Sequence, residues 1–295
     1  MSISFHLTAR GFAVSVQNNI AWLASYPRSG NTWLRFLLGN YAFSDFDGWS
    51  TCSFSVLDIH QWLGKPSNGY HKQELISSLD ESFSKLPKSN FRFNGHFCKT
   101  HFAASDLHPL MENTSKVIHL IRHPKDVLLS SLNFHKLMKS KGLPNEYEAT
   151  VRFIQLGGDP LWKRLGYGTW IEHFESWNKT DHPYLLLRYE DLKRDTLSEF
   201  IRVIEFLDIP LDRSRAEQAV ERSTYQEIRR FEVKERAANR FFDVSDGRYF
   251  THRGVSGQSL EGVGQGLDAT FEDKFDDFLQ RTGYLAADQA IRRSA

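Results

Sequence analysis

A short polar turn between an apolar run and an amphipathic stretch carries the strongest chemical signal in this sequence. Residues 20–25 (IAWLAS) have the composition of a buried strand, and residues 31–41 (NTWLRFLLGNY) have the apolar spacing of a helix. In the turn, Arg28 supplies a cation and Gly30 permits a tight backbone approach. Amides at a helix N-terminus bind phosphate-like anions through their N–H groups and the helix dipole. We therefore expect an anion site here; an ordinary strand-to-helix turn is the alternative.

The turn differs from the loop that binds nucleoside triphosphates in P-loop enzymes. That loop carries Lys directly after its second glycine, whereas Asn31 follows Gly30 here and Ser25 stands at the place of the first glycine. A nucleotide kinase or another P-loop phosphotransferase with bound magnesium is therefore disfavoured, and it is kept as an alternative function.

A Lys-Thr-His segment ends another strand candidate, residues 91–100 (FRFNGHFCKT). Positions two apart on a strand point to the same side, so Lys99 and His101 are expected to face one site. An imidazole titrates near neutral pH, which suits a general base. Because the chain has 12 histidines, a structural role is the alternative for any one of them.

The elements that must position these residues alternate between strands and helices. Residues 116–122 and 184–188 read as further buried strands, followed by helical stretches at 124–135 and 190–207. Such alternation predicts an α/β protein with three α/β/α layers and a central, mainly parallel sheet. Ligands bind such sheets beyond the carboxyl ends of the strands. Residues 49–90 are equally compatible with a lid over an acceptor site and with a peripheral helical insertion.

Composition excludes several classes of protein. The 295 residues include 37 Lys and Arg against 36 Asp and Glu, so a net charge of +1 provides no field for nucleic acid or membrane surfaces. Cys52 and Cys98 form no CxxC pair, which argues against a metal site and a disulfide framework. No apolar run is long enough to span a membrane, and residues 1–19 do not read as a signal peptide. We expect a cytoplasmic protein.

Taken together, the segments resemble those of the cytosolic-type sulfotransferases that use 3′-phosphoadenosine 5′-phosphosulfate (PAPS). The resemblance runs from about residue 20 to residue 284. The similar segments are SYPRSGNTW at 25–33, KTH at 99–101, RHPKDVLLS at 122–130, GTW at 168–170, RYEDL at 188–192, STY at 223–225 and RGVSG at 253–257. It implies one domain over residues 1–295 with a P-loop-like fold, which moves a sulfuryl group from PAPS to an acceptor hydroxyl, releases the bisphosphate PAP and requires no metal.

The resemblance also implies a role for each matching residue. His101 would be the general base, and Lys99 and Arg28 would stabilise charge on the leaving group. The 5′-phosphosulfate would be held by Arg28, Ser29, Gly30, Asn31 and Thr32, the adenine side by Trp33, Tyr189, Ser223 and Tyr225, and the 3′-phosphate by Arg122, Ser130, Arg253 and Gly254. Core packing is the alternative for Trp33. We expect two separated anion cradles, one at each end of a single nucleotide.

Several positions depart from the family pattern. Arg28 stands where lysine is usual, and His252 stands where arginine is common. A glycine-rich segment, residues 258–266 (QSLEGVGQG), replaces the usual tryptophan after the late basic loop. The short C-terminal dimer motif of the family is absent from this sequence, so the number of subunits is left open. The exchange of lysine for arginine keeps the charge of the donor loop but changes its geometry.

The acceptor is expected to be a small molecule that carries a phenolic, alcoholic or glycosidic hydroxyl on a partly apolar body. Phe102 and Phe134 flank the predicted site, and Trp62, Tyr70 and Trp170 are candidates for a mobile cover. A non-catalytic nucleotide-binding module is a further hypothesis, disfavoured because Lys99 and His101 are both present.

Overall fold

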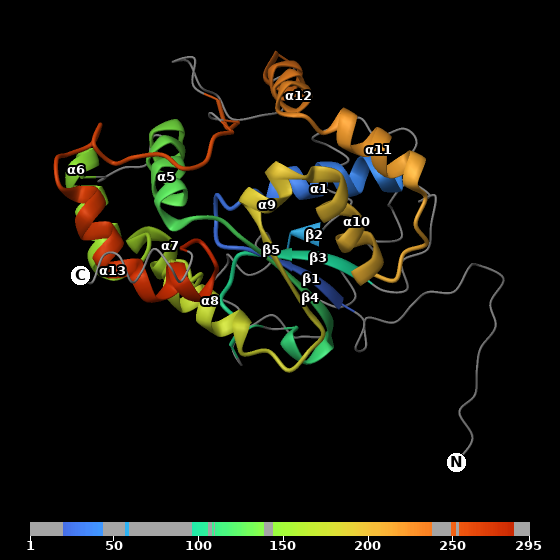
Figure 1. Ribbon diagram of the computed structural model, residues 1–295, viewed down its shortest axis with the longest axis horizontal. Coiled ribbons are helices and arrows are strands. Elements are labelled where there is room, and N and C mark those ends of the chain that lie inside the picture. Colours follow the sequence, from blue (N-terminus) through green and yellow to red (C-terminus); the bar gives the residue numbers. More distant parts are fainter. Residues whose placement is uncertain are drawn as a thin grey trace, which may run out of the picture.

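Five parallel strands form the centre of the structure, a computed structural model that describes residues 20–43, 57–58, 96–105, 108, 110–138, 144–237, 249–251 and 254–285. They lie in the order β2-β3-β1-β4-β5 (Figure 1). Their bounds are β1 Ile20–Ala24, β2 Leu57–Asp58, β3 His96–Thr100, β4 Thr114–Ile121 and β5 Tyr184–Arg188. Every pair of neighbouring strands is parallel, so the predicted fold class is confirmed.

The central strand β1 is buried on both of its faces, which explains its unbroken apolar sequence. Ala21 and Leu23 belong to the core on one side of the sheet. Ile20, Trp22 and Ala24 belong to the core on the other side. The indole of Trp22 donates to the Thr114 hydroxyl of β4 at 2.9 Å, which satisfies the one polar atom of this side chain.

Helices cover both faces of the sheet. One face packs against α1 (Asn31–Ala42), α9 (Tyr189–Arg194), α10 (Thr196–Phe206) and α11 (Arg213–Arg222), with α12 (Tyr225–Ala237) lying outside α1 (Figure 1). On the opposite side lie α5 (Pro124–Leu137), α6 (Glu146–Leu156), α7 (Pro160–Arg164), α8 (Trp170–Asn178) and α13 (Leu267–Arg281). A 3-10 turn, Met111–Asn113, leads into β4.

The order of the strands positions the predicted site. Because β1 lies between β3 and β4, the segments that follow these three strands emerge side by side at one edge of the sheet. This is the switch point at which open α/β sheets bind ligands. The turn after β1, the end of β3 with Lys99, and Arg122 after β4 therefore meet there.

Two predicted elements differ from the structure. The strand at 116–122 begins earlier, at Thr114, and ends at Ile121. Of the strand predicted at 91–100, residues 96–100 form β3, and residues 91–95 lie outside the described residues. The single helix predicted over residues 190–207 is two helices. Asp195 separates them, because its carboxylate caps α10 by accepting from the Ser198 amide at 3.1 Å.

Residues 49–56 and 59–90, with Trp62 and Tyr70, lie outside the described residues, so the two interpretations of that segment stay predictions. Across the ranges that the structure covers, no helix combines the length and the apolar character needed to cross a bilayer.

Candidate active site

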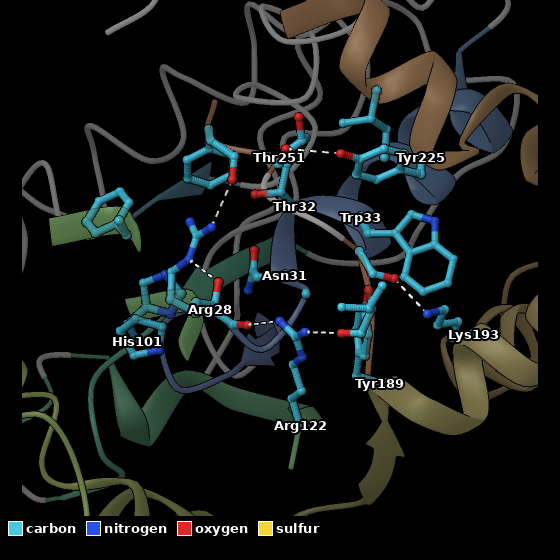
Figure 2. Close-up of a pocket in the computed structure, with 18 of the residues that line it drawn as sticks. Arg28, Asn31, Thr32, Trp33, His101, Arg122, Tyr189, Lys193, Tyr225 and Thr251 are labelled. Carbon is cyan, nitrogen blue, oxygen red and sulfur yellow. Dashed lines mark hydrogen bonds between the residues drawn. The ribbon is translucent and has the colours of Figure 1, made fainter. Parts of the chain in front are cut away.

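A cavity of about 590 Å³ lies at the carboxyl edge of the sheet. Of the predicted site residues, the structure brings twelve to its walls: Arg28, Gly30, Asn31, Thr32, Trp33, Lys99, His101, Arg122, Ser130, Tyr189, Tyr225 and Gly254. Figure 2 shows His101 and Arg28 on one side of this cavity and Trp33, Tyr189 and Tyr225 on the other. The side of the cavity with Arg28 and His101 thus faces a side formed by three aromatic rings.

The anion-binding turn runs from Tyr26 into α1. Gly30 caps the helix with a φ of 99°, no side chain caps the helix N-terminus, and its first turn has no acidic residue. The Ser29 amide donates to the Tyr26 carbonyl at 3.3 Å. Because the Ser29 amide is used within the turn, the amides available to an anion are those of residues 30–32. These amides lie at the positive end of the helix dipole.

Gly30 is required by its surroundings as well as by its backbone conformation. A Cβ atom at this position would lie 2.6 Å from the Tyr189 ring. The Trp33 ring meets the same Tyr189 ring edge-on at 5.5 Å. The first residue of α9 thus packs an aromatic ring against the turn after β1, and no residue larger than glycine fits between them.

Ser223 serves the aromatic side without facing the cavity. Its carbonyl accepts from the Trp33 indole at 2.9 Å, and its hydroxyl accepts from Asn40 at 3.0 Å. Ser223 is fully buried. Ser223 thus supports Trp33 from behind, and the predicted contact of Ser223 with the adenine stays a prediction.

The two predicted anion cradles touch each other. Arg28 donates from Nε to the Ser130 hydroxyl at 3.0 Å, and Arg122 donates from Nη1 to the Arg28 carbonyl at 3.2 Å. Ser130 lies on α5 and Arg122 follows β4, so three separate elements meet at Arg28. The structure therefore places the two predicted cradles next to each other, and their roles at the two ends of one nucleotide stay a prediction.

Two phenylalanine rings hold the Arg28 guanidinium. It lies 4.3 Å from the centroid of Phe250 and 5.0 Å from that of Phe134, and it donates from Nη2 to the Phe250 carbonyl at 2.9 Å. Burial, followed by the positive charge of Arg122, lowers the pKa of Arg28 from its ordinary value. Both causes favour an anion beside this guanidinium.

Arg122 is also buried and oriented. Its guanidinium stacks 4.5 Å from the Tyr189 ring and donates from Nη2 to the Val255 carbonyl at 2.7 Å. Its Nε is buried without an acceptor among the residues that the structure describes. A buried charged donor of this kind fits an anionic ligand.

The candidate base is fixed by the strand beside it. His101 approaches the Ser25 carbonyl with Nδ1 at 2.6 Å. A carbonyl oxygen only accepts, so Nδ1 carries the proton and Nε2 carries the lone pair. Lys99 lies two residues earlier on β3, and both residues line the cavity as their spacing predicts.

Aromatic and apolar side chains form the wall next to the charged side. Phe134, Trp162, Leu165, Tyr167 and Phe250 line the cavity there. Phe102 lies behind this wall, with its ring 5.2 Å from Tyr167. The prediction that Trp170 belongs to a mobile cover is wrong: it is 1% exposed and stacks on Phe174, because it opens α8 on the core side.

Four polar residues of the cavity escaped the sequence analysis. They are Lys193, Thr196, Thr251 and Gln258. Lys193 follows Tyr189 by one helical turn, a spacing that places both side chains on one face of α9. Its ammonium donates to the Gly254 carbonyl at 2.7 Å. Arg253 and His252 lie outside the described residues, so the predicted contact of Arg253 with the 3′-phosphate stays a prediction.

A parallel sheet whose central strand runs into an open helix N-terminus, flanked by buried arginines, defines a P-loop-like anion-binding protein. The sulfotransferase domain family matches residues 19–285. The chain therefore belongs to the sulfotransferase domain family.

Curated relatives agree with this assignment, and a solved structure shares the fold. Mouse Sulfotransferase 4A1 is 28% identical over 209 residues, which cover 70% of this chain and 66% of that protein, slightly less than two thirds. Human Sulfotransferase 2A1 is 25% identical over 261 residues, which cover 86% of this chain and 84% of that protein. The structure of a retinol dehydratase in complex with androsterone and PAP shares the fold, with a TM-score of 0.63, 20% identity, and coverage of 92% of this chain and 84% of that chain.

Proposed function

We propose that this protein transfers the sulfuryl group of PAPS to the hydroxyl of a partly apolar small molecule. The observation that carries the proposal is the shared cavity. An open helix N-terminus, the buried Arg122 and the pair Lys99 and His101 line the same 590 Å³ space. Membership of the sulfotransferase domain family supports the same reaction.

The residues present fit the nucleotide. The amides of residues 30–32 and the Arg28 guanidinium suit the 5′-phosphosulfate, and Arg122 with Ser130 suits the 3′-phosphate. Trp33 and Tyr189 offer ring faces and edges for the base. When bound, PAPS supplies the sulfuryl group.

In this proposal His101 removes the proton from the acceptor hydroxyl through Nε2. The Ser25 carbonyl keeps the other ring nitrogen protonated and holds the ring in place. Lys99 and Arg28 place positive charge where the leaving group gains negative charge. Positioning and charge neutralisation of this kind lower the barrier without a covalent intermediate on the protein.

The acceptor is proposed from the wall of the cavity. Four aromatic rings, those of Phe134, Trp162, Tyr167 and Phe250, line the same cavity as His101 and Arg28. Such a wall suits an apolar body whose hydroxyl points toward His101. The retinol dehydratase structure contains androsterone, a molecule of this kind. A phenolic, alcoholic or glycosidic hydroxyl meets the requirement.

A binding comparison tests the donor. Calorimetric titration with PAP, adenosine 5′-monophosphate and ATP should give tight binding of PAP alone, because only PAP places a second phosphate at Arg122. Equal affinity for PAP and adenosine 5′-monophosphate would contradict the proposal. Preference for ATP, with transfer that stops when EDTA is added, would favour the phosphotransferase alternative.

A transfer assay tests the acceptor. Phenols, steroids, sugars and peptides are incubated with PAPS carrying a labelled sulfuryl group, and the labelled products are separated. We expect transfer to phenols or steroids, and transfer to a polysaccharide alone would refute the acceptor class.

We further propose a cytoplasmic location, supported by the free buried thiol of Cys98 and testable by cell fractionation.

A further inference from the structure

Asp159 is a buried carboxylate outside the machinery described above. It lies in the segment before α7 and is 6% exposed. Its Oδ1 accepts from the amides of Leu161 at 2.8 Å and Trp162 at 3.4 Å, which caps α7. Its Oδ2 accepts from Nε2 of His135 at 2.6 Å. Both carboxylate oxygens are therefore used by fixed donors.

The same residue is bonded to the turn that binds the donor. The Asp159 amide donates to the Tyr26 hydroxyl at 2.8 Å. Tyr26 is 2% exposed and directly precedes Pro27 and Arg28. Asp159 thus joins three segments that are far apart in the sequence: the donor turn, α5 through His135, and α7.

Trp162 is packed where these three segments meet. Its ring lies 5.4 Å from the Tyr26 ring and 5.4 Å from the His135 ring. It also lies 6.5 Å from Phe134, the neighbour of His135 on α5. Trp162 and Phe134 both line the cavity, whereas Asp159 and His135 do not. The hydrogen bonds of Asp159 therefore set the position of two rings that face the ligand.

We propose that Asp159 is a positioning residue that fixes the aromatic wall formed by Phe134 and Trp162, and that it thereby determines which acceptors fit. The role in acceptor selection rests on the proposed function. The position of Trp162 is independent of it.

Asparagine at position 159 cannot replace the carboxylate. Three donors, on His135, Leu161 and Trp162, share its two oxygens, and an amide has one oxygen. If the amide NH₂ faces His135, the imidazole proton must move to Nδ1, which is buried without a partner among the described residues. If the amide turns the other way, the cap of α7 is lost. The second orientation releases the Trp162 amide, and the first leaves a buried imidazole N–H without an acceptor beside the Trp162 ring, so both disturb the packing around Trp162.

The test compares Asp159→Asn, His135→Leu and His135→Gln with wild type. Glutamine can place a side-chain NH₂ near the position of His135 Nε2, so this variant should rescue what leucine loses. Lys136→Gln is the matched control, because Lys136 is the next residue of α5 and its ion pair with Glu146 is exposed.

The first measurement needs no ligand. Protein labelled with 5-fluorotryptophan has seven tryptophan signals, and Trp162→Phe identifies the one from residue 162. In Asp159→Asn and His135→Leu this signal should shift or broaden, while the control leaves it in place. An unmoved Trp162 signal in both variants would overturn the proposal.

The second measurement separates acceptor from donor. With 2-naphthol as the acceptor, Asp159→Asn should raise the acceptor KM by about tenfold, with unchanged calorimetric affinity for PAP. A lowered kcat at unchanged acceptor KM would overturn the acceptor role. If wild type neither binds PAP nor sulfates 2-naphthol, the proposed function fails, and the fluorine signal still decides whether Asp159 positions Trp162.

Discussion

His101, which directly follows β3, and Ser25, which directly follows β1, are joined by a hydrogen bond of 2.6 Å between an imidazole nitrogen and a backbone carbonyl. Because the partner is backbone, no side-chain substitution at Ser25 removes it, and His101 keeps one tautomer. In the neutral ring, Nδ1 therefore carries the proton and Nε2 is the nitrogen that can accept one.

Replacing His101 should separate transfer from donor binding. His101→Ala removes the proposed base and leaves the residues proposed for PAP, so kcat should fall by about 10²–10⁴-fold while PAP affinity is retained. Initial rates and calorimetry check the two parts. His182→Ala, at a half-buried position outside the cavity, is the control. Turnover near wild type would remove His101 from the mechanism.

Arg28→Lys should weaken the site although it restores the residue that is usual in the family. The Phe250 and Phe134 rings lie beside a planar guanidinium, and a lysine ammonium cannot also reach both Ser130 and the Phe250 carbonyl. We expect PAP affinity to fall by about tenfold, corresponding to the loss of roughly 1.4 kcal/mol. Calorimetric titration measures it; tighter binding by the variant would contradict the described geometry.

Gly30→Ala should damage the anion site through its backbone. The added Cβ would approach the Tyr189 ring to 2.6 Å in a conformation with φ of 99°. Strain of this kind costs about 1–3 kcal/mol, visible as a lower urea midpoint, and PAP binding should be lost. Gly262→Ala is the matched control, since no atom lies within 4 Å of a Cβ there. Equal stability of the two variants would contradict this account.

Buried histidines should make the fold sensitive to acid. Burial lowers the pKa of His119 to about 3 and that of His123 to about 4, and it lowers the pKa of His173 well below its ordinary value. As pH falls below about 6.5, the unfolded chain binds protons that the folded chain does not. The free energy of unfolding should therefore fall, by about 1.4 kcal/mol per pH unit for each such histidine.

His173→Phe isolates one of these contributions. His173 is buried, its Nε2 has no partner among the described residues, and phenylalanine has a similar shape. Urea unfolding is measured at several pH values between about pH 7 and about pH 5. The free energy of unfolding should fall less steeply with falling pH than in wild type, by an amount that corresponds to about one proton. An identical slope would mean that this histidine titrates equally in both states.

Local patterns in the sequence were sufficient to predict that Lys99, His101 and the turn after β1 line one site. The apolar run of β1, Gly30 and the spacing of Lys99 and His101 are each legible within about ten residues, because strand period, turn chemistry and helix start act locally. The order of the strands then brings these segments to one edge, as the α/β class implies.

Contacts between distant segments were not predictable in this way. Asp159 bonds to Tyr26 and His135, and nothing near position 159 indicates either partner. The contact between Arg28 and Ser130 was missed because side chains from two separate elements decide it. The Ser223 carbonyl accepts from the Trp33 indole, and this contact was not predictable because a backbone carbonyl has no sequence signature.

The strand order also has a consequence for how the chain reaches its native state. Of the five strands, β1 is synthesised first, but it cannot pair until β3 and β4 are available. Ile20 pairs with His96 on one side and with Thr114 on the other. Closing such long loops slows folding. During synthesis, a nascent chain that has not yet emerged beyond β4 leaves the β4-facing backbone edge of β1 unpaired and open to aggregation.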